Sequence, residues 1–221
     1  MQEPKIIVGQ ELLKLIAEID EFKGRWTLLK TMSLDRLSQL RKVATIESIG
    51  SSTRIEGAKL TDIQVETLLS NLTTTSFKNR DEQEVAGYAE AMDLVFQAFE
   101  DLKVTENHIR QLHQTLLRHS EKDERHRGDY KTVPNHVVAK DQHGKEIGVV
   151  FETATPFDTP TEMEELVKWA SKATEEEAMH TLLIIAVFNV VFLAIHPFQD
   201  GSGRLSRILT TLMLLRMGYE Y

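Results

Sequence analysis

The feature that most constrains the fold is a long apolar segment near the C-terminus, in which Asn189 is the only polar residue between Leu182 and Ile195. These 14 residues are too few to cross a bilayer, which requires a run of roughly 20. We therefore predict that the segment forms a buried core helix and that the chain does not cross a membrane.

Apolar residues recur at helical spacing through most of the remaining chain, which predicts further helices. In the first half of the chain, this spacing is found in residues 12–22, 37–44, 85–102 and 109–116. After Pro160, helices are expected at about residues 160–172, 177–195 and 203–217. The pattern as a whole predicts a mainly α fold.

Two helix starts carry the capping-box pattern, in which a Ser or Thr is followed three residues later by Glu or Gln. Thr61 with Gln64 marks the first start. Thr159 with Glu162 marks the second, where Pro160 also stands at the first helical position, which favours proline. We therefore expect Thr61 and Thr159 to cap helices.

Helical spacing breaks between residues 125 and 159, where glycine, proline and asparagine are found. Short β-branched pieces lie on both sides of His143-Gly144, which predicts a single hairpin. The sequence shows no internal repeat and no composition shift that would mark a linker. It therefore predicts one compact, mostly helical domain with one inserted hairpin.

The composition excludes several classes of protein. The chain has no cysteine, which excludes disulfide scaffolds and Cys-ligated zinc or iron–sulfur sites. The 26 Lys and Arg residues against 34 Asp and Glu residues give a net charge of −8, so we expect no direct nucleic-acid binding by these residues. No secretory leader is recognisable, and the cytoplasm is the expected location. The apolar end at Tyr221 leaves open a continuation of the chain.

The segment most informative for function is 195–207, which connects the apolar helix to the last expected helix. A helix N-terminus presents unpaired N–H groups and partial positive charge, and Gly201 and Gly203 let the backbone approach a bound group closely. Arg204 and Arg207 lie three residues apart on one helix face, and arginine pairs bidentately with phosphate oxygens. The segment therefore predicts a phosphate-binding site.

Two further side chains of this segment suit phosphate chemistry. His196 can take a proton from an attacking hydroxyl, and Asp200 can hold Mg²⁺ on phosphate oxygens. A short Asp-Gly-Ser-Gly string on its own is more often an ordinary helix cap, with Asp200 or Ser202 as the capping residue. The full set of one His, one Asp, two Gly and two Arg at fixed spacing favours the phosphate site.

The string His196-Pro-Phe-x-Asp200-Gly-x-Gly-Arg204-x-x-Arg207 resembles the signature loop of the Fic family, with Ser202 at the position where that family has Asn. Further features that resemble the family are residues 109–117 with His113, Gly128-Asp129-Tyr130-Lys131, residues 156–169, and Ala186-x-x-Asn189-x-x-Phe192. The resemblance spans about residues 47–219 and implies a Fic-type helical bundle whose inserted hairpin is the family's flap.

By this resemblance, the protein is expected to be an Mg²⁺-dependent adenylyltransferase that uses ATP. It would move AMP to a Ser, Thr or Tyr hydroxyl of a target protein, which can be the protein itself. The implied roles are general base for His196, Mg²⁺ ligand for Asp200, N–H anion cradle for Gly201, Ser202 and Gly203, and polyphosphate binding for Arg204 and Arg207, with Arg207 toward the γ-phosphate. Because Ser202 lacks the amide of Asn, a reduced activity or an altered nucleotide preference stays open.

A second string, Ser52-x-x-x-Glu56-Gly57 within about residues 48–57, resembles the inhibitory motif that some Fic proteins carry N-terminal to the catalytic core. The resemblance implies that Glu56 pairs with Arg207 in the place of the γ-phosphate, since a carboxylate can replace a phosphate in the bidentate site of an arginine. Taken alone, such a string is more often an ordinary helix end with Gly past the last turn.

The hairpin, from about Lys131 to Phe151, resembles the flap that holds the target of Fic proteins by backbone pairing. Lys131, Val137 and Val138 are expected to contribute to target binding there, with Lys131 at a position where the family usually has Arg. Strand addition requires an exposed edge and little sequence identity, so the hairpin does not identify the target.

The resemblance divides the chain into an N-terminal helical region, 1–103, that carries the inhibitory motif, and a Fic core, 104–221, packed with it as one compact unit. Two alternatives stay open at this point. The same fold could remove AMP or transfer another nucleotide or phosphoryl group, and the chain could instead be a non-catalytic helical interaction module. A homodimer also stays open.

Overall fold

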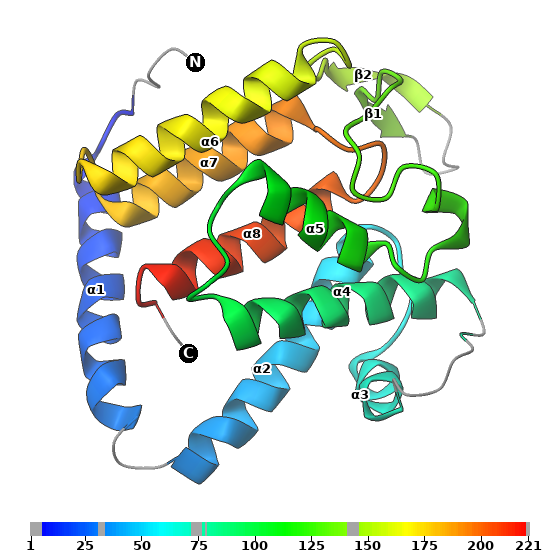
Figure 1. Ribbon diagram of the computed structural model, residues 1–221. Helices are drawn as coiled ribbons and strands as arrows, with labels where there is room; N and C mark the ends of the chain where they lie inside the picture. Colours follow the sequence, from blue (N-terminus) through cyan, green and yellow to red (C-terminus); the bar gives the residue numbers. More distant parts are fainter. Residues whose placement is uncertain (1–5, 31–33, 72–76, 78, 141–145, 220–221) are drawn as a thin grey trace.

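The computed structural model describes residues 6–30, 34–71, 77, 79–140 and 146–219. Within these residues the chain forms eight α-helices, one short 3₁₀ turn and one two-stranded antiparallel sheet (Figure 1). The helices are α1 (Gln10–Lys30), α2 (Leu34–Ile55), α3 (Asp62–Ser70), α4 (Arg80–Ala98), α5 (Glu106–Leu116), η1 (Glu121–Asp123, the 3₁₀ turn), α6 (Thr159–Glu175), α7 (Thr181–Ile195) and α8 (Ser202–Arg216). The strands are β1 (Val137–Lys140) and β2 (Glu146–Phe151). The predicted mainly helical fold with one hairpin is confirmed.

Helix α8 lies in the centre of the molecule and contacts α2, α4, α5 and α7 (Figure 1). Its apolar side chains point into the core on several sides. Leu205, Ile208, Leu209 and Leu212 are all fully buried. Because neighbouring helices surround α8, the position of its first turn is fixed by the hydrophobic core.

The apolar segment forms α7, which begins at Thr181 and packs against both α6 and α8. Phe188 and Phe192 are buried in the core, whereas Val190 is 68% exposed. The predicted core helix is therefore buried where it faces α6 and α8, but its outer face is exposed, which corrects the prediction. A helix that packs between two neighbours leaves its outer side to the solvent.

The C-terminal half of α2 joins the core, where Ile49 is 1% exposed. The helix ends just before Gly57, whose φ of 104° lies in the left-handed region that glycine adopts without strain. Thr61 then caps α3 through a capping box with Gln64, which confirms the first predicted helix start. This path brings residues 52–57 beside the N-terminal turn of α8.

The second predicted capping box is wrong. The N-cap of α6 is Asp158 instead of Thr159, and no side chain caps this helix end. Thr159 is already helical and fully buried, and its hydroxyl donates to the Thr155 carbonyl. Since Thr159 turns into the core, its oxygen does not reach the free N–H groups of the first turn.

The hairpin lies at the periphery, beside the end of the α6–α7 pair (Figure 1). Val138 pairs with Val149, and Ala139 pairs with Gly148. Several apolar side chains of β2 are exposed: Ile147, Val149, Val150 and Phe151. The expected turn at His143-Gly144 lies outside the described residues.

Helix α1 crosses the ends of α6 and α7 (Figure 1). Asp20 accepts a hydrogen bond of 2.6 Å from the Tyr219 hydroxyl, and Lys23 Nζ donates to the Met217 carbonyl at 2.7 Å. Helices α2 to α8 share one hydrophobic core, while the division at residue 103 stays a prediction. Among the described residues, no helix combines the length and the hydropathy that a membrane crossing requires.

Candidate functional site

The connection between α7 and α8 forms a tight loop in front of the first turn of α8. His196 ends α7 with a φ of 50°, which is rare for a residue with a side chain, and Gly201 precedes α8 with a φ of 82°. The first helical hydrogen bond runs from the Leu205 N–H to the Gly201 carbonyl. The N–H groups of Ser202 and Gly203 therefore precede the hydrogen-bond ladder, and with the helix dipole they can bind an anion.

Asn135 holds this loop from the side of the hairpin. Its side-chain amide donates to the carbonyls of His196 (3.2 Å) and Phe198 (2.7 Å). Its Oδ1 accepts hydrogen bonds from Thr153 Oγ1 and Lys131 Nζ. The two ends of the hairpin thus clamp the loop backbone. Neither Asn135 nor Thr153 was predicted from the sequence, because only a generic turn signal, Pro134-Asn135, marks this place.

Lys131 does not lie on an exposed strand edge, and this corrects the expectation that it contributes to target binding. Its side chain is 3% exposed, and Nζ donates to the Ile195 carbonyl at 2.8 Å and to Thr153 Oγ1 at 3.0 Å. Burial lowers the pKa of Lys131 to about 8. The buried ammonium group instead fixes the end of α7, one residue before His196.

His113 supports the loop from α5. Its ring is fully buried and stacks on Phe198 with 3.8 Å between the ring centroids. The Gly128 N–H donates to Nδ1 at 2.9 Å, so the proton of the neutral ring resides on Nε2, which donates to the Asp200 carbonyl at 2.9 Å. Burial lowers the pKa of His113 to about 4, which keeps this donor neutral. The residue is therefore a support of the loop backbone.

Ser202 turns its side chain away from the open end of α8. Its hydroxyl is 1% exposed, accepts from the Phe198 N–H at 3.2 Å and lies 3.3 Å from the Phe198 carbonyl. Only the backbone N–H of Ser202 remains for the predicted anion cradle. The hydroxyl closes the loop on itself and is not available to a bound phosphate.

His196 is the residue directly after the end of α7, where the loop toward α8 begins. Its ring is half-buried, and Nδ1 has no hydrogen-bond partner among the described residues. Burial, and next the charge of Lys131, lower the pKa of His196 below 6.5. The imidazole is therefore neutral near pH 7 and can accept a proton.

Asp200 is held between two cations. Its Oδ1 accepts from Arg204 Nη2 at 2.8 Å, and its Oδ2 accepts from Lys122 Nζ at 2.6 Å. Burial alone would raise the pKa of Asp200, but the Lys122 hydrogen bond and the Arg204 charge outweigh burial and lower the pKa to about 2. The carboxylate is thus ionised at every physiological pH. Lys122, which precedes Asp200 by 78 residues, was not predicted from the sequence.

Arg204 was expected to bind polyphosphate, but its side chain is enclosed by the protein. Its side chain is 2% exposed, and it lies between Asp200 and Glu84 of α4, with 3.2 Å from Nη1 to Glu84 Oε2. Glu84 is itself 5% exposed and also pairs with Arg80. The enclosed guanidinium group of Arg204 thus contacts Asp200 and Glu84, and its role in polyphosphate binding stays a prediction. Glu84 gave no signal in the sequence, since it is one of many glutamates on helices.

Arg207 lies about one turn further along α8 and contacts the segment that resembles the inhibitory motif. Its Nε donates to Ser52 Oγ at 2.6 Å, and its Nη2 donates to the Ser52 carbonyl at 3.0 Å and to Glu56 Oε1 at 2.8 Å. The side chains of Arg207 and Glu56 are 29% and 35% exposed. The structure therefore brings Arg207 together with Ser52 and Glu56, which precede it by 155 and 151 residues in the chain.

Gly203 makes this contact sterically feasible. A Cβ atom at this position would collide with Glu56 Oε1. The Glu56 carboxylate thus lies directly over the first turn of α8, where an anion would bind. Gly57 provides the left-handed turn after Glu56, with a φ of 104°. The nucleotide-binding role of Gly203 and the place of Gly57 in an inhibitory motif stay predictions.

Val137 and Val138 lie on β1, as expected for residues of the hairpin. Val138 is half-buried, and the placement of the Val137 side chain lies outside what the structure describes. Their contribution to target binding stays a prediction.

The donors present fit a Mg²⁺ ion that arrives with a nucleotide. Among the described residues no group of three or more His, Cys, Asp or Glu side chains could hold a metal ion. Asp200 is a single hard oxygen ligand at the site, and magnesium is often bound by one carboxylate together with substrate phosphates and water. Asp200 is therefore the residue that would hold Mg²⁺.

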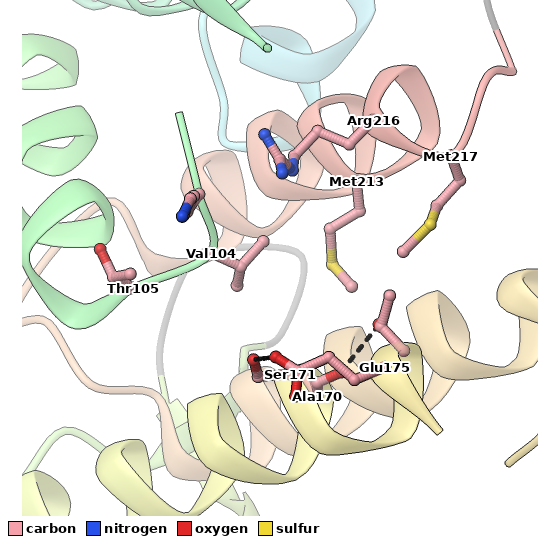
Figure 2. A pocket seen from close by; sticks show the side chains of 10 residues that line it. Val104, Thr105, Ala170, Ser171, Glu175, Met213, Arg216 and Met217 are labelled. Atoms are coloured by element: carbon pink, nitrogen blue, oxygen red, sulfur yellow. Dashed lines mark hydrogen bonds between the residues drawn. The ribbon is translucent and has the colours of Figure 1, made fainter. Parts of the chain in front are cut away.

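A separate hollow lies at the opposite end of α8, between α8, α6 and the segment before α5 (Figure 2). The side chains of Met213 and Met217 point from α8 toward α6, with Val104 beside them. Glu175 and Arg216 lie at its edge. The hydroxyl of Ser171 donates to Glu175, and none of the described histidines lines this hollow, so we locate the chemistry at the other end of the helix.

Comparisons with known proteins agree with this location. The sequence model of the Fic/DOC family matches residues 103–214. The chain is 27% identical over 185 residues to the protein adenylyltransferase Fic of Drosophila grimshawi, and 26% identical over 185 residues to that of Drosophila melanogaster. Both alignments cover 83% of this chain and 35% of the relative, so the chain spans about a third of the length of the curated relatives it matches.

Two solved structures are similar to this chain over most of its length. A Fic-domain-containing signaling protein from Bacteroides thetaiotaomicron has a TM-score of 0.76 at 27% identity, with coverage of 90% of this chain and 73% of that chain. A Fic family protein from Desulfovibrio desulfuricans has a TM-score of 0.78 at 28% identity, with coverage of 97% and 60%.

Proposed function

Because this chain belongs to the Fic/DOC family and is a distant homologue of protein adenylyltransferase Fic, we propose that it is an Mg²⁺-dependent adenylyltransferase. It transfers AMP from ATP to a Ser, Thr or Tyr hydroxyl of a protein target, which can be a second copy of the chain. The observation that carries this proposal is the convergence of His196, Asp200 and Arg207 on the open N-terminus of α8.

In the proposed reaction, the target hydroxyl oxygen attacks the α-phosphorus of ATP, and the bond to the pyrophosphate breaks. His196 accepts the hydroxyl proton, which its lowered pKa permits near pH 7. The N–H groups of Gly201, Ser202 and Gly203 bind the phosphate oxygens at the helix N-terminus. Asp200 would hold Mg²⁺, which would supply positive charge to the phosphates. Pyrophosphate leaves with the electron pair of the broken bond.

Glu56 is proposed to inhibit this reaction. In the structure its carboxylate takes the Nη2 donor of Arg207 at 2.8 Å and covers the turn that begins with Gly203. An ATP molecule whose γ-phosphate needs Arg207 must displace Glu56 or bind in another orientation. Since the pair is one-third exposed, the displacement costs little, and the inhibition is reversible.

The hairpin is proposed to hold the target. Strands β1 and β2 form a ribbon of two strands, and the ends of this ribbon are anchored to the loop of His196 through Asn135 and Thr153. A target segment that pairs with the edge of the ribbon, beside Val137 and Val138, would therefore be held at a defined position relative to His196, the proton acceptor.

The test is incorporation of label from α-³²P-ATP with Mg²⁺ and cell lysate. We compare the protein with Glu56→Gly, with Glu56→Gly plus His196→Ala, and with Glu56→Gln as a variant that keeps side-chain volume but lacks the charge. Label that rises in both single variants and disappears in the double variant supports adenylyl transfer under inhibition by Glu56. Label that appears only from γ-³²P-ATP would show phosphoryl transfer instead.

AMP removal is a second candidate, favoured by one observation. The Glu56 carboxylate lies at the anion-binding turn, where it could position a water molecule against a phosphodiester on a modified target. A target labelled by the Glu56→Gly variant and then given to the unmodified protein separates the two activities. Loss of label that requires Glu56 would support removal, and ATP binding without either activity would favour a non-catalytic module.

A further inference from the structure

Lys122 forms a contact with the site that the proposed reaction does not use. It lies on η1, the 3₁₀ turn that follows α5, and reaches across to the loop before α8. Its Nζ lies 2.6 Å from Asp200 Oδ2, and its side chain is 44% exposed. The residue therefore brings a partly exposed cation to the carboxylate that would hold Mg²⁺.

The turn that carries Lys122 is firmly anchored. Asp123 is 3% exposed, accepts a hydrogen bond from Ser120 Oγ and lies 3.0 Å from His126 Nε2. The Ser120 carbonyl also accepts a hydrogen bond of 2.7 Å from Arg127 Nη2. Because this buried network fixes the backbone on both sides of Lys122, the lysine reaches Asp200 from a fixed base.

The two oxygens of Asp200 are held in different ways. Arg204, which holds Oδ1, is 2% exposed and enclosed by the core. Lys122, which holds Oδ2, has a flexible four-carbon stem and a half-exposed side chain. Of the two cations on Asp200, Lys122 is therefore the one that an arriving metal ion can displace, because the Arg204 side chain is enclosed.

We propose that Lys122 is a positioning residue that occupies the metal position on Asp200 Oδ2 while no nucleotide is bound. In this arrangement a divalent cation alone binds weakly, since it must displace a cation that already neutralises the carboxylate. When the cation arrives on a polyphosphate, the phosphate oxygens provide further metal ligands and a new anionic partner for Nζ. Lys122 thus makes metal binding depend on the nucleotide.

This inference rests on the proposed function only for the identity of the nucleotide, because the exchange at Asp200 requires no turnover. Removing a unit positive charge in contact with Asp200 strengthens the attraction of that carboxylate for a divalent cation by at least about tenfold, even when the surrounding dielectric is high. The predicted effect can therefore be measured on the nucleotide-free protein.

The test is binding of Mn²⁺ to the nucleotide-free protein, followed by electron paramagnetic resonance of the free ion. We compare the protein with Lys122→Met, with Lys122→Arg, and with Lys103→Met, which removes an exposed lysine near the far end of α8. Lys122→Met is expected to bind Mn²⁺ at least about tenfold more tightly, whereas the other two variants bind as the parent does. Adding Asp200→Asn to Lys122→Met should abolish the gain.

Equal Mn²⁺ affinity of Lys122→Met and the parent protein would overturn the inference, and so would a gain that persists with Asp200→Asn. Since Lys122 is half-exposed, its variants are expected to fold, and thermal unfolding of each variant checks this. Absence of adenylyl transfer together with the expected Mn²⁺ result would overturn the proposed function alone. Transfer together with unchanged Mn²⁺ affinity would overturn this inference alone.

Discussion

The two arginines of the first turns of α8 are three residues apart and have opposite surroundings. Arg204 is 2% exposed and lies between the carboxylates of Glu84 and Asp200. Arg207 is 29% exposed and is held by Ser52 and Glu56 from a distant part of the chain. Arg204 is thus part of a buried ion-pair network. Arg207 instead makes a partly exposed contact that a ligand can replace.

This difference in burial indicates which ion pairs of the site support the fold and which can be exchanged. A buried ion pair is costly to break, because the remaining partner is left as an uncompensated charge. A partly exposed pair contributes little to stability, because water replaces the lost partner. We therefore expect changes on the Arg204 side to affect folding, and changes on the Arg207 side to affect ligand binding.

The largest expected effect on stability is that of Arg204→Met. This change leaves Glu84, which is 5% exposed, with the more exposed Arg80 as its cation. We expect the free energy of unfolding to fall by about 3 kcal/mol, measured by urea denaturation. The double variant Arg204→Met with Glu84→Gln should regain part of this loss. A loss below about 1 kcal/mol in the single variant would show that the ion pairs of Arg204 with Glu84 and Asp200 do not stabilise the fold.

A smaller loss is expected when the support beneath His196 is removed. Lys131→Met deprives the Ile195 carbonyl of its donor, while Thr153 still donates to Asn135. We expect the free energy of unfolding to fall by about 2 kcal/mol, since a buried carbonyl loses its hydrogen bond. Lys122→Met, which removes a half-exposed lysine, is the matched control and should change this free energy by less than about 1 kcal/mol.

The pH dependence of stability gives a third test of the fixed network. Because the pKa of Asp200 is lowered to about 2 in the folded protein, its ionised form stabilises the fold above the unfolded value of about 4. This contribution, about 1–2 kcal/mol for a partly exposed group, is lost as the pH falls from 4 toward 2. Asp200→Asn should flatten the dependence of the unfolding free energy in this range. An unchanged slope would mean that Asp200 is not held by its two cations.

The smallest effect on stability is expected on the other side of the turn. Glu56→Gln removes a charge from a pair whose side chains are about one-third exposed. The free energy of unfolding should change by less than about 1 kcal/mol in urea denaturation. A loss as large as that of Arg204→Met would contradict the comparison, because the contact between Glu56 and Arg207 would then support the fold.

Much of this arrangement could be predicted from the sequence, and the reasons are local. The apolar period gave the helices, and the spacing from His196 to Arg207 gave the loop and its open helix N-terminus. The pairing of Glu56 with Arg207 was predicted from a short motif, Ser52-x-x-x-Glu56-Gly57. This motif is weak on its own and became informative because the chain also contains the loop from His196 to Arg207.

The rest depends on tertiary packing. Nothing in the pattern distinguishes Arg204 from Arg207, because which arginine is enclosed depends on where α4 places Glu84. Lys122 reaches Asp200 through a turn whose conformation is set by buried partners of Asp123. Likewise, Lys131 was expected on the target-binding edge because the sequence could not show that its side chain is buried beneath α7.

The most direct test of the account is the affinity for ATP and for ADP in the presence of Mg²⁺, measured by calorimetry on the protein, on Glu56→Gly, and on Glu56→Gly with Arg207→Ala. If Glu56 occupies the place of the γ-phosphate on Arg207, Glu56→Gly should bind ATP at least about tenfold more tightly, because a charge-assisted hydrogen bond is gained. ADP affinity should change much less, and Arg207→Ala should remove the gain. An equal gain for both nucleotides, or a gain that persists without Arg207, would contradict the account.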